Sequence, residues 1–274
     1  MAATLLKLEG RTAVVTGAAG GIGRGIALAL GRRGSHLALA DIDDGGLRRT
    51  AAELDALGVR ASRHHLDVAD AAAVAAFPQQ VTAEHAGVDI LVNNAGVALA
   101  GNFEQVAEAD FEWLFAINFY GVVRMTRAFL PLLHQSDDAR IVNISSVYGL
   151  IAPPGNTAYV ASKFAVRGFS ESLRHELEGS AIGVTVVHPG GVATSIARNA
   201  KLPAGVDPAE AEVRRKAFEA YLRMKPEDAG EIIVRGIERR QVRVLVGADA
   251  KRVALIERFM PVSYWNLIGR SLGR

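Results

Sequence analysis

The chain has 274 residues, half of them hydrophobic, and its formal net charge of +2 gives no indication of a nucleic-acid partner. The absence of cysteine excludes disulfides, thiolate metal sites and a cysteine nucleophile, and apart from His64 and His65 the histidines show no paired metal-ligand spacing. No secretory signal and no run of roughly 18 apolar residues occurs, so we expect one compact, soluble, cytoplasmic domain without a transmembrane segment.

The first predicted strand leads into a glycine-rich turn. Thr12-Ala13-Val14-Val15-Thr16 is apolar enough for a buried strand, Gly17-Ala18-Ala19-Gly20-Gly21-Ile22-Gly23 follows, and a helical run extends from Ile26 to Leu30. Glycines let the backbone approach a pyrophosphate, and the start of a helix supplies free N–H groups. This order of elements predicts a phosphate cradle, and the alternative is a tight bend without a ligand.

The second predicted strand, His36 to Asp41, ends in an acid that lies eighteen residues after Gly23. An acid there can bind the ribose hydroxyls of an adenine dinucleotide and repel a 2′-phosphate. One like-charge pair about 4 Å apart, at an effective dielectric near 20, costs roughly 4 kcal/mol. Asp41 therefore predicts a preference for NAD over NADP, and the alternative is an ordinary acid at the end of a strand.

Strands and helices alternate along the rest of the chain, which implies a parallel sheet with helices on both faces. Asp70 is predicted to cap a helix, and Asn118 is predicted to lie inside a long one. The expected strands are 62–68, 88–92, 140–146, 184–187 and 242–246, and the expected helices are 47–57, 70–76, 110–133 and 158–177.

Tyr159 and Lys163 are four residues apart in the last of these helices, so their side chains share one face. Ser146 lies thirteen residues before Tyr159, at the end of a predicted strand. A tyrosine four residues before a lysine is weak evidence alone. The glycine turn earlier in the chain makes it a candidate active site.

Two later segments are harder to interpret. Residues 195–225 interrupt the alternation, and the helix start predicted at Asp207-Pro208-Ala209-Glu210 favours a substrate lid over a plain surface excursion. The tail, residues 250–274, mixes apolar residues with arginines. We expect it to pack against the body or a neighbouring subunit, and the alternative is peripheral contact with a membrane.

The ordered set Thr16-Gly17-x-x-x-Gly21-x-Gly23, Asn93-Asn94-Ala95-Gly96, Asn118, Ser146, Tyr159-x-x-x-Lys163 and Pro189-Gly190 resembles the short-chain dehydrogenase/reductase family. The resemblance covers about residues 8–195 and the final strand. It implies an α/β fold with a Rossmann-type, doubly wound parallel sheet of about seven strands in three layers. Residues 1–274 would form a single NAD(P)-binding domain, and family members are commonly homodimers or homotetramers.

The resemblance also implies roles for individual residues. Tyr159 would be the acid/base, Lys163 would tune it and bind the nicotinamide ribose, and Ser146, with Ser145 as the competing choice, would hold the substrate oxygen. Asn118 would complete a proton relay through water. The implied cofactor-binding residues are Gly17, Gly20, Gly21, Ile22, Gly23, Asp41, Asp67, Val68, Asn94, Ala95, Gly96, Tyr159, Lys163, Pro189, Gly190, Val192 and Thr194, and the substrate-pocket residues are Ser146, Tyr148, Tyr159 and Ile196.

Alcohol oxidation needs a base that works near neutral pH, so the tyrosine pKa must fall from near 10 to about 7. An ammonium about 4 Å away supplies a contribution of that order. We therefore predict an NAD-dependent oxidoreductase that interconverts a secondary alcohol and a ketone, with a hydrophobic substrate such as a steroid, an acyl compound or a terpenoid. The alternatives are an NADP-dependent carbonyl or 3-oxoacyl reductase and a nucleotide-sensing scaffold without turnover; no metal is expected.

Overall fold

The computed structural model describes residues 5–271 except 205, 207–211, 213–214 and 217–218. Seven parallel strands form one sheet in the order β3-β2-β1-β4-β5-β6-β7, which confirms the predicted doubly wound fold. The strands are β1 (Thr12–Thr16), β2 (His36–Asp41), β3 (Ala61–His65), β4 (Ile90–Asn93), β5 (Ala139–Ile144), β6 (Ile182–Pro189) and β7 (Arg243–Val246).

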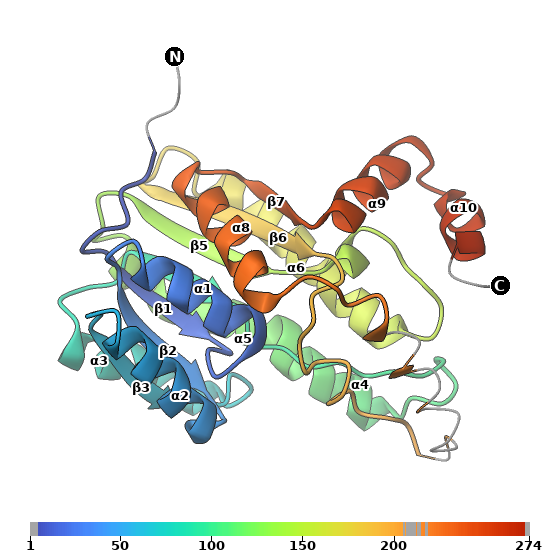
Figure 1. The fold of residues 1–274 in the computed structure, drawn as a ribbon, viewed down its shortest axis with the longest axis horizontal. Helices are drawn as coiled ribbons and strands as arrows, with labels where there is room; N and C mark the ends of the chain where they lie inside the picture. Colours follow the sequence, from blue (N-terminus) through green and yellow to red (C-terminus); the bar gives the residue numbers. More distant parts are fainter. Residues whose placement is uncertain (1–4, 205, 207–211, 213–214, 217–218, 272–274) are drawn as a thin grey trace.

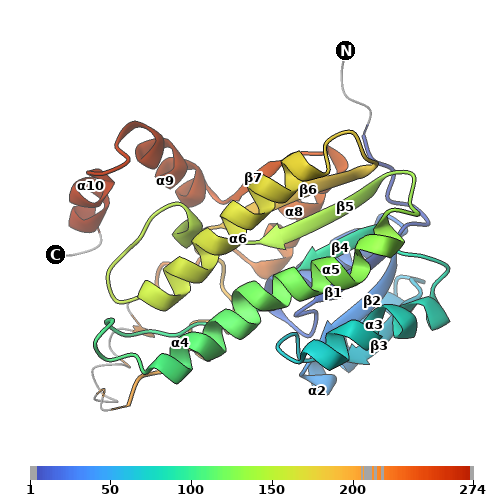
Figure 2. The same cartoon turned by 180° about the vertical axis from the view of Figure 1, so that it is seen from behind.

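Helices cover both faces of this sheet, as Figures 1 and 2 show from opposite sides. One face carries α1 (Gly21–Gly31), α2 (Asp44–Asp55) and α8 (Pro226–Glu238). The other carries α3 (Ala71–Glu84), α5 (Gly121–Leu133) and α6 (Thr157–Glu176). Because both faces are covered, every residue of β1, β4 and β5 is buried, which explains their nearly continuous apolar sequences.

The long helix expected at 110–133 is interrupted at Asn118. It consists of α4 (Glu108–Phe115), a π-helical turn η1 (Ala116–Tyr120) and α5. The buried Asn118 side chain accepts a hydrogen bond from the Val97 N–H (2.9 Å) and donates one to the Val97 carbonyl (3.0 Å). Such single π turns are frequent at functional sites.

Other boundaries also differ from the expectation. β3 ends at His65, so Asp67 and Val68 lie beyond the strand, where the Asp67 carboxylate accepts the Ala69 N–H at 2.8 Å. The helices α8, α9 (Ala248–Phe259) and α10 (Tyr264–Ser271) were not predicted as helices. The helix start predicted at 207–210 lies outside the described residues. None of the helices in the described ranges is both long and apolar enough to span a bilayer.

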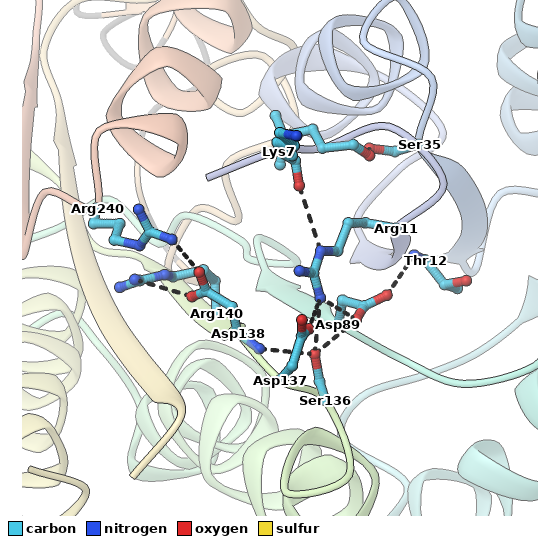
Figure 3. Close-up of polar contacts among 11 residues, drawn as sticks. Lys7, Arg11, Thr12, Ser35, Asp89, Ser136, Asp137, Asp138, Arg140 and Arg240 are labelled. Carbon is cyan, nitrogen blue, oxygen red and sulfur yellow. Dashed lines mark hydrogen bonds and ion pairs between the residues drawn. The ribbon is translucent and has the colours of Figure 1, made fainter. Parts of the chain in front are cut away.

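A network of ion pairs connects the amino-terminal ends of the strands (Figure 3). The Arg11 guanidinium contacts Asp89 at 2.8 Å and Asp137 at 2.6 Å, while Asp89 accepts the Thr12 N–H at 2.9 Å. Asp138 pairs with Arg140 and with Arg240 in the same network. This network lies at the opposite ends of the strands from the glycine turn, so it fastens the sheet without contributing to the candidate site.

Candidate active site

The glycine turn between β1 and α1 has a backbone that only glycine fits. Gly17 and Gly21 have φ angles of +67° and +52°, and a Cβ on Gly23 would lie 2.1 Å from the Gly17 carbonyl oxygen. No side chain caps α1, and among the described residues none accepts a hydrogen bond from the N–H of Gly21, Ile22 or Gly23. Open N–H groups at the start of a buried helix suit a pyrophosphate.

Side chains from neighbouring strands hold this turn in place. The Asp41 carboxylate accepts the Ala19 N–H at 3.0 Å, which fixes the acid beside the glycines. The Asn94 amide donates to the carbonyls of Thr16 and Gly17, at 3.0 and 3.2 Å. The ends of β1, β2 and β4 are thus joined around the cradle, as the sequence motifs imply.

The loop after β6 reaches the same place. A Cβ on Gly21 would lie 3.2 Å from Thr194 Cγ2, so Thr194 borders the cradle. Gly190 leaves no room for a side chain, because the Asp249 carboxylate would lie 2.2 Å from its Cβ. Asp249 also accepts the Gly191 N–H at 2.6 Å. Asp249 was not singled out from the sequence, because nothing in the surrounding tail pairs it with a loop nearly sixty residues earlier.

The remaining predicted cofactor residues differ in their surroundings. Val68 is buried, and its side chain packs 2.9 Å from the Cβ position of Gly121, so it faces the core. Leu66 donates its N–H to the Asp41 carbonyl, which brings the chain before Asp67 next to the Asp41 end of the cradle. Val192 is buried and forms a bridge with Met224.

The candidate catalytic side chains converge at the end of β5. Ser146 lies beside Tyr159, close enough to act on the pKa of its phenol, and Ser146 Oγ accepts the Tyr148 N–H at 3.1 Å. The neighbouring Ser145 hydroxyl instead donates to the Lys163 carbonyl at 2.8 Å and is buried against α6. Of the two serines, Ser146 is therefore the one that lies beside the Tyr159 hydroxyl.

Lys163 and Asn118 meet on the other side of the tyrosine. A Cβ on Gly96 would lie 3.1 Å from Asn118 Oδ1 and 3.6 Å from Lys163 Nζ. The Lys163 ammonium lies 5.6 Å from the centre of the Tyr159 ring and donates to the Ile144 carbonyl at 3.1 Å. The fold thus brings together all four predicted catalytic residues, which come from η1, the end of β5 and α6.

The protonation of this group differs from the expectation. Burial raises the pKa of Tyr159 to about 12, although the neighbouring Ser146 acts in the opposite direction. Burial also lowers the pKa of Lys163 to about 8. The prediction that Lys163 pulls the tyrosine pKa down toward 7 is therefore wrong for the protein alone. The reason is that burial dominates the tyrosine pKa, and the Lys163 ammonium, which donates to the Ile144 carbonyl, is not among the groups that shift it.

The residues predicted for the substrate pocket include aromatic and apolar side chains. Tyr148 packs edge-on against Tyr159, with the ring centres 6.0 Å apart. Ile196 is half-buried and begins the first half of the predicted lid. That half is tied down at Lys201, which forms a bridge with Leu99 and an ion pair of 2.5 Å with Asp110. Within the described ranges, no group of three or more ligating side chains could hold a metal ion.

Comparisons with known proteins agree with this arrangement. A family model described as "short chain dehydrogenase" matches residues 11–204. SadH of Mycobacterium tuberculosis, named as an oxidoreductase, is 44% identical over 97% of this chain and 96% of its own. The oxidoreductase UcpA of Salmonella typhimurium is 40% identical over 82% of this chain and 87% of its own.

Solved structures are similar over the same range. A short-chain dehydrogenase/reductase from Burkholderia phymatum in complex with NAD superposes with a TM-score of 0.84, at 29% identity over 93% of this chain and 95% of that one. A metagenomic short-chain oxidoreductase in complex with NADP superposes with a TM-score of 0.71, at 31% identity over 88% and 98%. The chain therefore belongs to the short-chain dehydrogenase/reductase family and is an oxidoreductase that acts on CH–OH donors.

Proposed function

We propose that this enzyme interconverts a secondary alcohol and a ketone with NAD, using Tyr159 as the general acid and base. The observation that carries the proposal is that Tyr159 and Ser146 lie side by side next to the buried Lys163, whose Nζ is 5.6 Å from the centre of the Tyr159 ring. These three groups, which donate or accept protons, lie together at the carboxyl end of β5, two strands away from the glycine cradle at β1. This is the edge at which doubly wound folds bind their ligands.

Each side chain has a distinct part in the proposed reaction. The nicotinamide ring, when bound, accepts or returns the hydride, and the protein does the rest. Ser146 Oγ orients the substrate oxygen, and Tyr159 Oη takes the hydroxyl proton during oxidation or gives it back during reduction. Lys163 Nζ places positive charge next to the phenol. Asn118 holds the Val97 backbone, which keeps the chain after Gly96 in place.

The high pKa of Tyr159 has a consequence for the direction of reaction. A phenol with a pKa of about 12 is protonated at neutral pH, so it is ready to donate a proton to a ketone. Oxidation needs the phenolate, so its rate is expected to rise with pH as the phenol ionises. The positive charge of the oxidised nicotinamide ring, close to the phenol, favours that ionisation.

The first experiment changes Tyr159→Phe, with Tyr120→Phe as the control because the Tyr120 ring is half exposed outside the site. We expect turnover to fall at least ~100-fold, the usual size of a lost general acid–base, while NADH binding measured by fluorescence stays close to the wild type. Retention of more than a few per cent of the activity by Tyr159→Phe removes this residue from the role.

Cofactor preference is the second part of the proposal. Asp41 supports NAD, because its carboxylate is held beside the glycine turn and would repel a 2′-phosphate. We expect kcat/KM to be higher with NAD than with NADP by up to about a thousandfold, which corresponds to roughly 4 kcal/mol. Asp41→Asn keeps an acceptor for the Ala19 N–H and should reduce the ratio of kcat/KM with NAD to kcat/KM with NADP. The control Asp44→Asn, at a nearby exposed position, should leave this ratio unchanged. A higher kcat/KM with NADP than with NAD in the wild type contradicts the proposal.

The substrate is proposed to be hydrophobic, such as a steroid, an acyl compound or a terpenoid. Tyr148, which packs against Tyr159, supports this, and so do Ile196 and the buried Leu99 beside the bridge to Lys201, because all three side chains are largely apolar. A spectrophotometric screen of alcohols and ketones with NAD(H) tests it. A homodimer or homotetramer is proposed as well, supported by the exposed aromatic rings of Tyr120 and Phe164. A cytoplasmic location stays a prediction of the sequence.

A further inference from the structure

The two C-terminal helices stand away from the rest of the molecule. Figures 1 and 2 show α9 and α10 beyond the end of the sheet, with neither helix lying on a sheet face. α9 is attached at its start, where Ala250 is buried and Asp249 accepts the Gly191 N–H. α10 is attached through the Tyr264 hydroxyl, which accepts the Ala152 N–H at 2.9 Å. The tail therefore packs against the body in part: these contacts, Glu257 beside Arg243 and the buried Ile268 attach it, while other side chains stay exposed.

The outer side of α9 exposes large apolar side chains. Leu255 is 59% exposed and Phe259 is 74% exposed, and their spacing of four residues places them on one stripe of the helix. The turn that follows continues the stripe, with Met260 exposed and Val262 92% exposed. So many large apolar side chains on a protruding segment indicate a contact with something outside this chain.

Three cations border this apolar stripe. Lys251, Arg252 and Arg258 are exposed, and none of them makes an ion pair with a described residue. By helical spacing Lys251 and Arg258 lie on one side of Leu255, and Arg252 lies on the other. Glu257 is half-buried, and it interacts with Arg243 of β7. The other acid of α9, Asp249, accepts the Gly191 N–H at the start of the helix, so the side of α9 around Leu255 carries net positive charge.

This charge pattern distinguishes between the possible occupants of the surface. In a two-fold symmetric contact centred on this patch, the patch would face itself, so three unpaired cations would meet three others. That arrangement brings like charges together around an apolar contact and is unfavourable. An anionic lipid surface matches both properties, because it accepts apolar side chains and attracts the surrounding cations.

We propose that the outer side of α9 and the turn after it, from Lys251 to Val262, anchor this enzyme to an anionic lipid surface. Leu255, Phe259 and Val262 enter the boundary between headgroups and acyl chains, and the three cations contact the headgroups. Asp249 and Tyr264 hold the two helices to the body, so the anchor keeps a fixed orientation toward the membrane.

Co-sedimentation of the full chain with vesicles tests the proposal. We expect binding to vesicles that contain one third phosphatidylglycerol in phosphatidylcholine, much weaker binding to phosphatidylcholine alone, and release at about 0.5 M salt. The variant Lys251→Gln/Arg252→Gln/Arg258→Gln should bind on the order of 100-fold more weakly, since each cation near an anionic surface contributes about fivefold. The variant Leu255→Ser/Phe259→Ser should lose at least about tenfold.

Matched variants elsewhere on the surface provide the controls. Lys7→Gln/Arg32→Gln/Arg63→Gln removes the same charge from exposed positions outside the tail, and Leu57→Ser removes an exposed leucine at the end of α2. Both should bind vesicles like the wild type. Equal binding by the tail and control variants overturns the proposal, and so does absence of wild-type binding. If Leu255→Ser/Phe259→Ser instead dissociates an oligomer in light scattering without vesicles, the surface holds a second copy and the proposal is wrong.

Discussion

Ser145 and Ser146 are adjacent in the sequence, yet their hydroxyl groups have different partners. Ser145 donates to the carbonyl of Lys163, whereas Ser146 accepts the Tyr148 N–H and lies beside Tyr159. Burial acts in opposite directions on the next two groups, since it raises the pKa of Tyr159 and lowers that of Lys163. At the scale of single residues, the environment rather than the residue type determines which group can exchange a proton.

His188 illustrates the same effect behind the site. It is fully buried at the end of β6, its Nδ1–H donates to the Ser146 carbonyl at 2.8 Å, and its Nε2 has no partner among the described residues. Burial lowers the pKa of His188 from 6.5 to about 4. Between these two values the unfolded chain binds a proton that the native protein does not, so stability falls as pH falls.

The prediction concerns acid stability. Between pH 6.5 and about 4, His188 should cost the native state up to about 3 kcal/mol in the free energy of unfolding. His188→Gln keeps a donor for the Ser146 carbonyl and removes the titration, so its stability should fall less over this range. Urea unfolding at several pH values measures the difference. The exposed His134→Gln should behave like the wild type, and parallel pH curves for His188→Gln and wild type contradict the prediction.

At the scale of elements, glycines allow the helices α1 and α8 to pack closely against each other. α1 and α8 cross where a Cβ on Gly25 would lie 2.3 Å from the Pro226 carbonyl oxygen, and one on Gly230 would lie 2.2 Å from the Gly25 carbonyl carbon. The close packing of the two helices therefore depends on direct contact between their backbones. Arg24 strengthens it through its ion pair with Glu227 and fixes α2 through Glu53 at 2.6 Å.

A pair of glycine substitutions tests this packing. Gly25→Ala forces a methyl group into the Pro226 carbonyl, so we expect a loss of about 3 kcal/mol or more in the free energy of unfolding. Gly168→Ala in α6 is the control, because nothing lies within 4 Å of its Cβ position. It should stabilise by about 0.5 kcal/mol or more through helix propensity. Chemical denaturation measures both, and equal stability of the two variants would show that the close contact is unimportant.

At the scale of the whole molecule, the amino-terminal and carboxyl-terminal ends of the strands have different functions. The edge where strands begin is closed by the ion pairs around Arg11 and Asp89, whereas the edge where they end carries the glycine turn and Tyr159 (Figures 1 and 3). A ligand in the glycine cradle would contact β1, β2, β4 and the loop after β6. Its binding energy would therefore be shared by most of the sheet.

Cofactor binding should accordingly stabilise the entire fold. At a concentration about 100 times its Kd, NAD should add about 2.7 kcal/mol to the free energy of unfolding. For a chain of this size that raises Tm by about 5 °C or more. NADP at the same concentration should raise it less, because of Asp41. Differential scanning fluorimetry with both nucleotides measures the shifts, and an equal or larger shift with NADP contradicts the expectation.

Sequence patterns predicted the alternation of strands and helices, the glycine turn and the shared face of Tyr159 and Lys163, and the family resemblance supplied the other candidate site residues. These features are local, because they depend on the periodicity of apolar residues, on glycine at positions of positive φ and on the four-residue spacing of Tyr159 and Lys163. The ordered motifs also identified the family, which the comparisons with known proteins confirm.

Only the tertiary structure decided the features that depend on contacts between distant residues. The Asn118 amide in the π turn pairs with the backbone of Val97, and the loop after β6 is held by Asp249 from the far end of the chain. The high pKa of Tyr159 follows from burial, which is a property of the assembled fold. The exposure of Leu255 and Phe259 is equally invisible in a sequence, because apolar side chains look alike until their partners are placed.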